Sequence, residues 1–251
     1  MMTRTPSKTS LAVLLVLACA TLPLVGPTVA HADGTSAVSP PGAPAPAAAP
    51  APASPLPNVT QVVTQVQNFY NKTRSFKSDF EQTFVVKAYN MTKRSKGQVT
   101  FLKPGKMDWT YADPAGNRVV SDGTTLKVYE EANKQVYEQP VAGSQYPAAL
   151  SFLTGQGELS SSFNFTLYEG DGQFQFPGGY VLVGEPKTPT AAYTKVLFYV
   201  DKQTFQIRRV LIVDGQSNRN RFDFVNPQVN MTVDPNQFVF VAPPNTTVVR
   251  P

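Results

Sequence analysis

Cysteine and histidine are almost absent from this sequence of 251 residues. It contains one cysteine, Cys19, and one histidine, His31, and both lie near the N-terminus. If that stretch is removed, the mature chain has no thiol and no imidazole. This excludes disulfide bonds, Cys/His metal sites, haem ligation by these residues, and Ser-His-Asp or Cys-His nucleophiles. Carboxylate or lysine chemistry remains open, but a binding protein that is not an enzyme and carries no metal or cofactor is the first expectation.

Residues 1–32 have the organisation of an export signal. Arg4 and Lys8 give a cationic start, an apolar run follows, and Ala30-His31-Ala32 supplies small residues at the A-x-A positions. This order predicts a signal peptide cleaved after Ala32. A transmembrane helix is the first alternative, but proline and glycine interrupt the run. The second is a lipobox in which Cys19 is acylated and becomes the mature N-terminus.

Residues 33–57 are rich in proline and alanine and carry one charged side chain, Asp33. Such a segment has too little large apolar surface to pack, and its prolines favour an extended conformation. It is predicted to be a disordered, semi-rigid linker. Residues 58–251 contain every Phe, Tyr and Trp of the chain and are long enough for one sizeable core. They are predicted to form a single domain.

Two helices are expected in this domain. The first begins after Asn58, which suits an N-cap, and its apolar residues follow a helical spacing from Val59 to Tyr70. The second is shorter and spans about 147–155. It has Pro147 in its first turn, Leu150 and Leu153 three positions apart, and Gly155 at its C-terminus.

Elsewhere the apolar period is two, which indicates strands. One strand face carries Phe76, Phe80 and Phe84, and later strands are expected at 161–168, 179–186, 193–201, 205–214, 219–226 and 238–243. Closely spaced strands without intervening helices indicate an antiparallel meander. Because two helices cannot cover a long sheet from both sides, the sheet is expected to curl on itself, with the helices closing one opening.

The charged residues define no clear catalytic group. The acids are scattered or lie in turns, and no phosphate-binding glycine loop is present. A hydrolase with a carboxylate pair stays a remote alternative, because such pairs converge in space and not in sequence. Loss of Arg4 and Lys8 with the signal leaves a small positive charge, too mild to indicate nucleic-acid binding.

Two basic clusters nevertheless stand out. Lys93-Arg94-Ser95-Lys96 is expected at a hairpin, whereas Arg208-Arg209 and the pair Arg219 and Arg221 are expected on adjacent strands. Either these clusters are solvated edges that discourage strand pairing, or they dock an anionic partner.

Several motifs, taken in order, resemble one family. Gly97–Tyr111 reads GQVTFLKPGKMDWTY, residues 119–126 read VVSDGTTL, and Tyr180–Lys187 reads YVLVGEPK. Phe222-Asp-Phe-x-Asn226 and Phe238-Val-Phe-x-x-Pro243 close the pattern. Together they resemble the LolA family of periplasmic outer-membrane lipoprotein carriers over the whole of 58–251.

The resemblance implies a mainly β fold: an incomplete, unclosed antiparallel barrel with a helical lid over an apolar cavity. Lys103 falls where many members have an arginine that holds the lid shut, and a lysine, without the forked geometry, suggests a weaker latch. Leu150 and Leu153 are expected in the lid. The acyl-chain cavity is expected to be lined by Phe80, Phe84, Phe101, Met107 and Trp109.

The function implied is a monomeric periplasmic carrier. It would bind the acyl chains of lipoproteins released by an inner-membrane ABC transporter and deliver them to an outer-membrane lipoprotein receptor. An alternative of the same fold is a membrane-anchored lipoprotein acceptor or an envelope lipid-sensing domain. An acylated Cys19 would favour the anchored form, and a mature start at Asp33 the soluble carrier.

Overall fold

The computed structural model describes residues 58–142, 151–155, 157–170 and 172–250. Helix α1 (Val59–Lys72) begins as predicted, with Asn58 Oδ1 accepting a hydrogen bond from the Thr60 N–H at 2.8 Å. Its buried face carries three valines and Tyr70. In these described residues, no helix combines the length and the apolar character needed to cross a membrane.

Most of the described chain is strand. In chain order the strands are β1 (Ser75–Val86), β2 (Met91–Leu102), β3 (Lys106–Asp113), β4 (Ala115–Asp122), β5 (Thr125–Glu130), β6 (Gln135–Pro140), β7 (Phe163–Leu167), β8 (Gly179–Pro186), β9 (Lys195–Asp201), β10 (Ile207–Val213), β11 (Arg219–Val229) and β12 (Thr247–Val249). The short helices are η2 (Lys87–Tyr89), η3 (Ser151–Thr154), α2 (Leu159–Ser162) and η4 (Pro235–Phe238).

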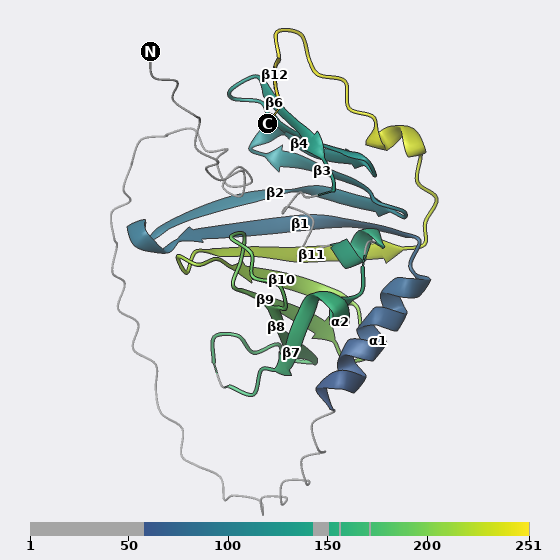
Figure 1. Ribbon diagram of the computed structural model, residues 1–251, viewed down its shortest axis with the longest axis vertical. Coiled ribbons are helices and arrows are strands. Elements are labelled where there is room, and N and C mark those ends of the chain that lie inside the picture. The colour runs from purple at the N-terminus through teal and green to yellow at the C-terminus, as the bar shows by residue number, and fades with distance from the viewer. Residues whose placement is uncertain (1–57, 143–150, 156, 171, 251) are drawn as a thin grey trace, which may run out of the picture.

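Across the described ranges the strands form one 12-stranded sheet, in the order β12-β6-β5-β4-β3-β2-β1-β11-β10-β9-β8-β7. Two antiparallel meanders, β1–β6 and β7–β11, are joined at the centre by the pairing of β1 with β11. β12 pairs with β6 in parallel. The sheet is therefore open, as Figure 1 shows, with β12 and β7 at its two edges.

The strands alternate between two faces of the sheet, so each face has its own character. On β3, Met107, Trp109 and Tyr111 point to one face, called here the inner face, and Asp108 and Thr110 point to the outer face. Helix α1 packs beside β7 and η3, and the Tyr70 Oη accepts from the Ile207 N–H at 3.1 Å. The sheet with its helices is the incomplete barrel with a helical lid that the sequence predicts (Figure 1).

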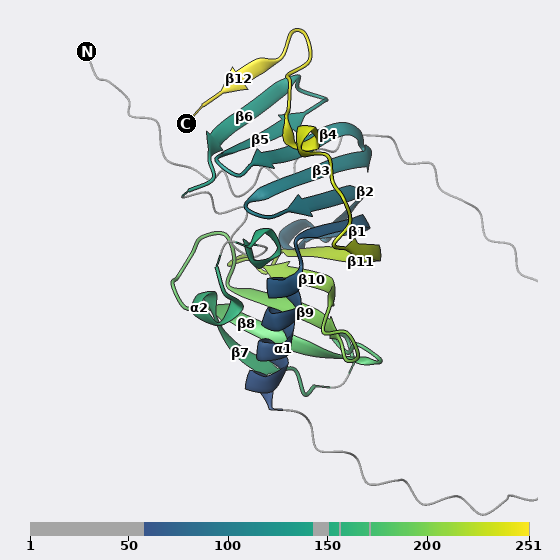
Figure 2. The same cartoon turned by 90° about the vertical axis from the view of Figure 1, so that its right-hand side faces the viewer.

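The predicted strand at 238–243 is wrong. Asp234 caps η4 by accepting from the Asn236 N–H at 2.9 Å, Pro235 starts the turn, and Phe238 ends it. Phe238 is 2% exposed, so it packs on the outer face instead of entering a ladder. Figure 2 shows this C-terminal segment running along the outside of the β3–β5 region before β12 joins β6.

Two further expectations need correction, and one is confirmed. The start of the predicted 161–168 strand belongs to α2, which the sequence did not indicate. The cluster Lys93–Lys96 lies at a hairpin, as expected: it belongs to β2 and follows the β1–β2 turn, which is formed by η2 and by Asn90 at a φ of 48°. The second predicted helix is confirmed only as η3 at its C-terminal end, since Pro147 and Leu150 lie outside the described residues.

Candidate functional site

A cluster of aromatic side chains occupies the inner face at the centre of the sheet. Trp109 is fully buried, and its ring centroid lies 4.9 Å from that of Phe80, 5.2 Å from Phe222 and 5.9 Å from Phe101. These four side chains come from β3, β1, β11 and β2. Edge-to-face packing of this kind adds to the free energy gained from burial. The inner face is therefore a continuous apolar surface built from both meanders.

Four of the five predicted cavity residues lie together in this surface. Phe80, Phe101 and Trp109 are at most 1% exposed, and Met107 is 3% exposed. Phe84 points to the same face from β1, but it is only partly buried and lies outside the cluster. The structure thus brings together four residues of the predicted lining and leaves the fifth near the end of the sheet.

A polar seam separates Phe84 from the aromatic cluster. Gln82 lies between Phe80 and Phe84 on the inner face of β1 and is 4% exposed. Its Oε1 accepts from the Tyr111 hydroxyl at 3.1 Å, and its Nε2 donates to Asn220 Oδ1 at 2.9 Å. Burial raises the pKa of the Tyr111 hydroxyl above its usual range, so this hydroxyl stays a hydrogen-bond donor.

One polar atom inside the cluster lacks a partner. Trp109 Nε1 is buried and makes no hydrogen bond, a state that costs about 1–3 kcal/mol for a typical buried group. The packed interior therefore contains one unsatisfied hydrogen-bond donor, and a guest with an acceptor oxygen could pair with this N–H.

The part of the predicted lid that is described closes over this interior. Leu153, in η3, is 2% exposed and belongs to the same apolar core. The Thr154 carbonyl accepts from the Gly105 N–H at 2.9 Å, which ties η3 to the β2–β3 turn. Helix α1 is tied to α2 through Gln67 Oε1, which accepts from the Leu159 N–H at 2.8 Å.

Lys103 contacts both parts of this lid. Its Nζ donates to the Tyr70 carbonyl of α1 at 2.5 Å. Gly155, after η3, has a φ of +76°, and a Cβ there would lie 2.8 Å from Lys103 Cδ, so the lysine stem packs directly on the glycine. Partial burial lowers the pKa of the Lys103 ammonium. A pocket of about 300 Å³ lies beside it, lined by Gln67, Asn71, Lys103, Gly155, Gly157 and Glu158.

We expect Lys103→Met to loosen the lid without unfolding the sheet. Methionine keeps an apolar stem against Gly155 but removes the ammonium, and a hydrogen bond to a charged group contributes about 1.5–3 kcal/mol. Amide hydrogen exchange in α1 and around 153–155 should rise by roughly tenfold, because that factor corresponds to about 1.4 kcal/mol. Lys72→Met is the matched control, because it removes an exposed ammonium from the C-terminal end of α1, the end that Lys103 contacts. It should leave the exchange rates unaltered. Equal exchange in both variants would contradict the latch.

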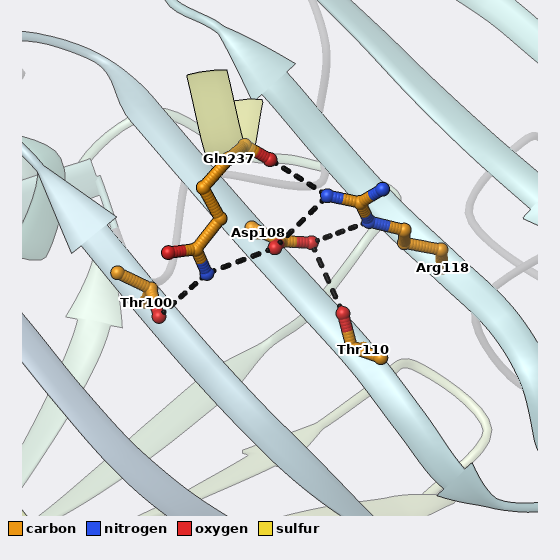
Figure 3. A network of polar contacts seen from close by, with 5 residues as sticks. All are labelled: Thr100, Asp108, Thr110, Arg118 and Gln237. Carbon is orange, nitrogen blue, oxygen red and sulfur yellow. Dashed lines mark hydrogen bonds and ion pairs between the residues drawn. The ribbon is translucent and has the colours of Figure 1, made fainter. Parts of the chain in front are cut away.

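The outer face carries a polar network that the sequence did not reveal (Figure 3). Asp108 is 3% exposed and accepts from Arg118 Nε at 2.8 Å and from Arg118 Nη2 at 3.1 Å. Gln237 Nε2 donates to Asp108 Oδ2 and to Thr100 Oγ1, each at 3.0 Å. The Gln237 carbonyl in turn accepts from Arg118 Nη2 at 2.6 Å. This network fastens η4 to β2, β3 and β4.

The buried carboxylates do not form a catalytic pair. Among the described residues, Asp108 and Glu130 are the buried acids. Asp108 points to the outer face, whereas Glu130 shares the inner face of β5 with Leu126 and Val128. In the same residues, no group of three or more His, Cys, Asp or Glu side chains could hold a metal ion. The arrangement favours an apolar guest over acid–base chemistry.

Comparisons with known proteins identify the family of this chain. Residues 71–241 match the family model of the outer membrane lipoprotein carrier protein LolA. The outer-membrane lipoprotein carrier protein of Bordetella avium is 30% identical over 74% of this chain and 86% of its own, and that of Nitrosomonas europaea is 26% identical over 78% and 92%. A solved LolA superfamily protein from Nitrosomonas europaea covers 74% of this chain and 99% of its own at 11% identity, with a TM-score of 0.43. The chain belongs to the LolA family.

Proposed function

We propose that this protein is a periplasmic, non-enzymatic carrier that holds the acyl chains of lipoproteins against its inner face. The observation that carries the proposal is the aromatic cluster of the inner face, which is covered by α1 and η3 and retains an unpaired Trp109 N–H. The names of the curated relatives support lipoprotein cargo. The acyl-chain path would run over Phe80, Phe101, Met107 and Trp109 and continue to Phe84, with Leu150 and Leu153 in the lid.

The packed interior explains how such a carrier could release its cargo. Burial of one methylene contributes about 0.8 kcal/mol, so an acyl chain of roughly 15 methylenes offers on the order of 12 kcal/mol. Several chains held that strongly would approach the limit of non-covalent affinity and would not leave. Here a guest must first separate side chains that already contact one another. The free energy of that opening lowers the net affinity, and Lys103 adds to it by holding the lid closed.

We further propose the route and the domain organisation. Residues 1–32 direct export and are removed after Ala32, residues 33–57 give reach, and 58–251 form a monomeric carrier domain. An inner-membrane ABC transporter would supply the cargo and an outer-membrane receptor would accept it. Mass spectrometry of the native protein tests the first step, since a mature start at Asp33 supports a soluble carrier and an acylated Cys19 an anchored one.

The acyl-chain path is tested by two adjacent substitutions. Phe84 and Val85 are both partly buried on β1, but they point to opposite faces. Phe84→Glu places a carboxylate on the inner path, where its desolvation is costly, and should weaken binding of a synthetic triacylated lipopeptide by about tenfold or more. Val85→Glu, on the outer face, should leave binding unchanged. If both variants bind like the parent protein, Phe84 does not lie on the path.

The delivery step requires membranes. Added to spheroplasts, the full chain should release a lipoprotein as a soluble complex and pass it to outer membranes that contain the receptor. Lipoprotein that stays in the spheroplasts, although the protein binds the lipopeptide in solution, would refute the transporter route and leave lipid binding intact.

A further inference from the structure

The hairpin formed by β1 and β2 projects from the sheet at the end away from α1 (Figure 1). β1 pairs with β11 as far as Val85, but the pairing of β2 with β3 starts only at Lys96. Within the described part of the chain, residues 91–95 therefore have no strand neighbour on the β3 side. Residues 86–94, which include η2 and the start of β2, are called here the hairpin tip.

The hairpin tip exposes apolar side chains. Tyr89 is 80% exposed and Met91 is 41% exposed. Phe84, Val85 and Val86 behind them are only partly buried. Large apolar side chains that gather on a projection, instead of lying singly on the surface, are typical of an interaction site.

The charge around the hairpin tip has one sign. Residues 83–96 contain Lys87, Lys93, Arg94 and Lys96 and no acid. The acids nearest in the fold are Glu81 and Asp113, which lie opposite Lys96 on the two neighbouring strands, and Asp214 in the neighbouring β10–β11 turn. The Asp214 carboxylate is already engaged by hydrogen bonds from within its own turn. The hairpin tip therefore keeps its positive charge.

Neighbouring arginines on the outer face behave differently. Arg209 and Arg221 both form ion pairs with Asp223, and the Arg219 guanidinium lies 5.4 Å from the centre of the Phe174 ring. Arg208, the remaining member of the second basic cluster, donates from Nη1 to Gln206 Oε1 at 3.4 Å. The second cluster is thus engaged within the protein, whereas no ion pair is formed by Lys87, Lys93, Arg94 or Lys96 in the part of the fold described. Only the first cluster is available to a partner.

We propose that the hairpin tip docks on an anionic phospholipid surface. Tyr89 would enter the headgroup region, where its amphipathic ring is favoured, and Met91 would follow it. The basic side chains would extend to the lipid phosphates with their stems on apolar surface. Protection of a free strand edge accounts for the charges, but it does not account for an exposed tyrosine at the apex of the turn. This surface goes beyond cargo binding and needs no acyl chain in the interior.

Vesicle flotation of the full chain, prepared without bound lipoprotein, tests the proposal. The protein should float with phosphatidylethanolamine vesicles that contain the anionic lipid phosphatidylglycerol. It should not float with vesicles in which phosphatidylcholine replaces the phosphatidylglycerol. Added salt should weaken the binding to the anionic vesicles. Tyr89→Ser and Lys87→Glu should each reduce the binding about fivefold to tenfold. Val241→Ser, at an 82% exposed site in the C-terminal segment, and Lys202→Glu, in the β9–β10 turn, are the matched controls and should bind like the parent protein.

Equal binding to both kinds of vesicle, no binding to either, or binding that both tip variants retain would overturn the proposal. Binding only to membranes that contain the transporter would also overturn it and would assign the hairpin tip to a protein partner. Lipopeptide binding in solution, without membranes, reports on the carrier function separately. A protein that binds lipopeptide but not vesicles therefore contradicts this inference alone.

Discussion

Phe80→Ala should lower the free energy of unfolding by about 3–5 kcal/mol, the range for deleting a buried phenylalanine. Phe80 is 1% exposed and contacts the rings of Trp109, Tyr111 and Phe222. Its removal takes away these contacts and leaves a cavity at the centre of the sheet. Urea denaturation followed by the fluorescence of Trp109 measures the change.

Phe84→Ala is the matched control, because it is the same substitution on the same face of the same strand. Phe84 is partly exposed and lies outside the aromatic cluster, so its loss should cost only about 1 kcal/mol, in line with partial burial. Equal losses of stability in the two variants would contradict the difference in packing. In lipopeptide binding, Phe84→Ala should have a larger effect than its small loss of stability suggests, because Phe84 can contact a guest without any change in the packed cluster.

Asp108→Ala should destabilise the protein by about 3 kcal/mol, the lower end of the range for breaking a buried ion pair on one side. Arg118 keeps 27% of its side chain exposed, which softens the loss. The Gln237 amide would also lose an acceptor. Chemical denaturation gives the magnitude, and limited proteolysis should show cleavage near η4 before the sheet is attacked.

Asp113→Ala is the matched control, because it also removes one carboxylate from β3. Asp113 ends the same strand but is exposed, and surface substitutions of this kind change stability by less than about 0.5 kcal/mol. Lipopeptide affinity should be the same in both variants, because the network lies on the outer face. Loss of affinity in a folded Asp108→Ala protein would show that the two faces are coupled.

The sequence predicts the features that depend on local pattern. Asn58 and the valine spacing define α1, and the period of two places Phe80, Phe84 and Trp109 on the correct face. The period of two shows on which face of a strand a side chain lies, but it does not show how deeply that side chain is buried. Phe80 and Phe84 therefore look alike in sequence, although a buried glutamine separates them in the fold.

The features that the sequence misses depend on partners distant in the chain. In the sequence, Asp108 lies on the polar face of its strand and looks solvent-exposed. It is buried because Gln237 and Phe238 of the distant C-terminal segment cover that face. The alternating run at 238–243 resembles a strand because Phe238 and Phe240 both cover the outer face, while the valines between and after them are exposed. The contact of Lys103 with α1 is expected from the family resemblance and is present in the structure. The exchange experiment tests whether this contact holds the lid closed.

The pairing of β1 with β11 has a consequence for the order in which the protein can form. Ser75 Oγ donates to the Met231 carbonyl, 156 positions further along the chain, so the central pair of the sheet closes only when nearly all of the domain is present. Contacts of such long range slow folding. During synthesis from the N-terminus, the meander β1–β6 can form early, because each of its strands pairs with a neighbour in sequence. The edge of β1 that faces β11 would meanwhile be unpaired, so the half-made protein exposes a free strand edge until the last strands are present.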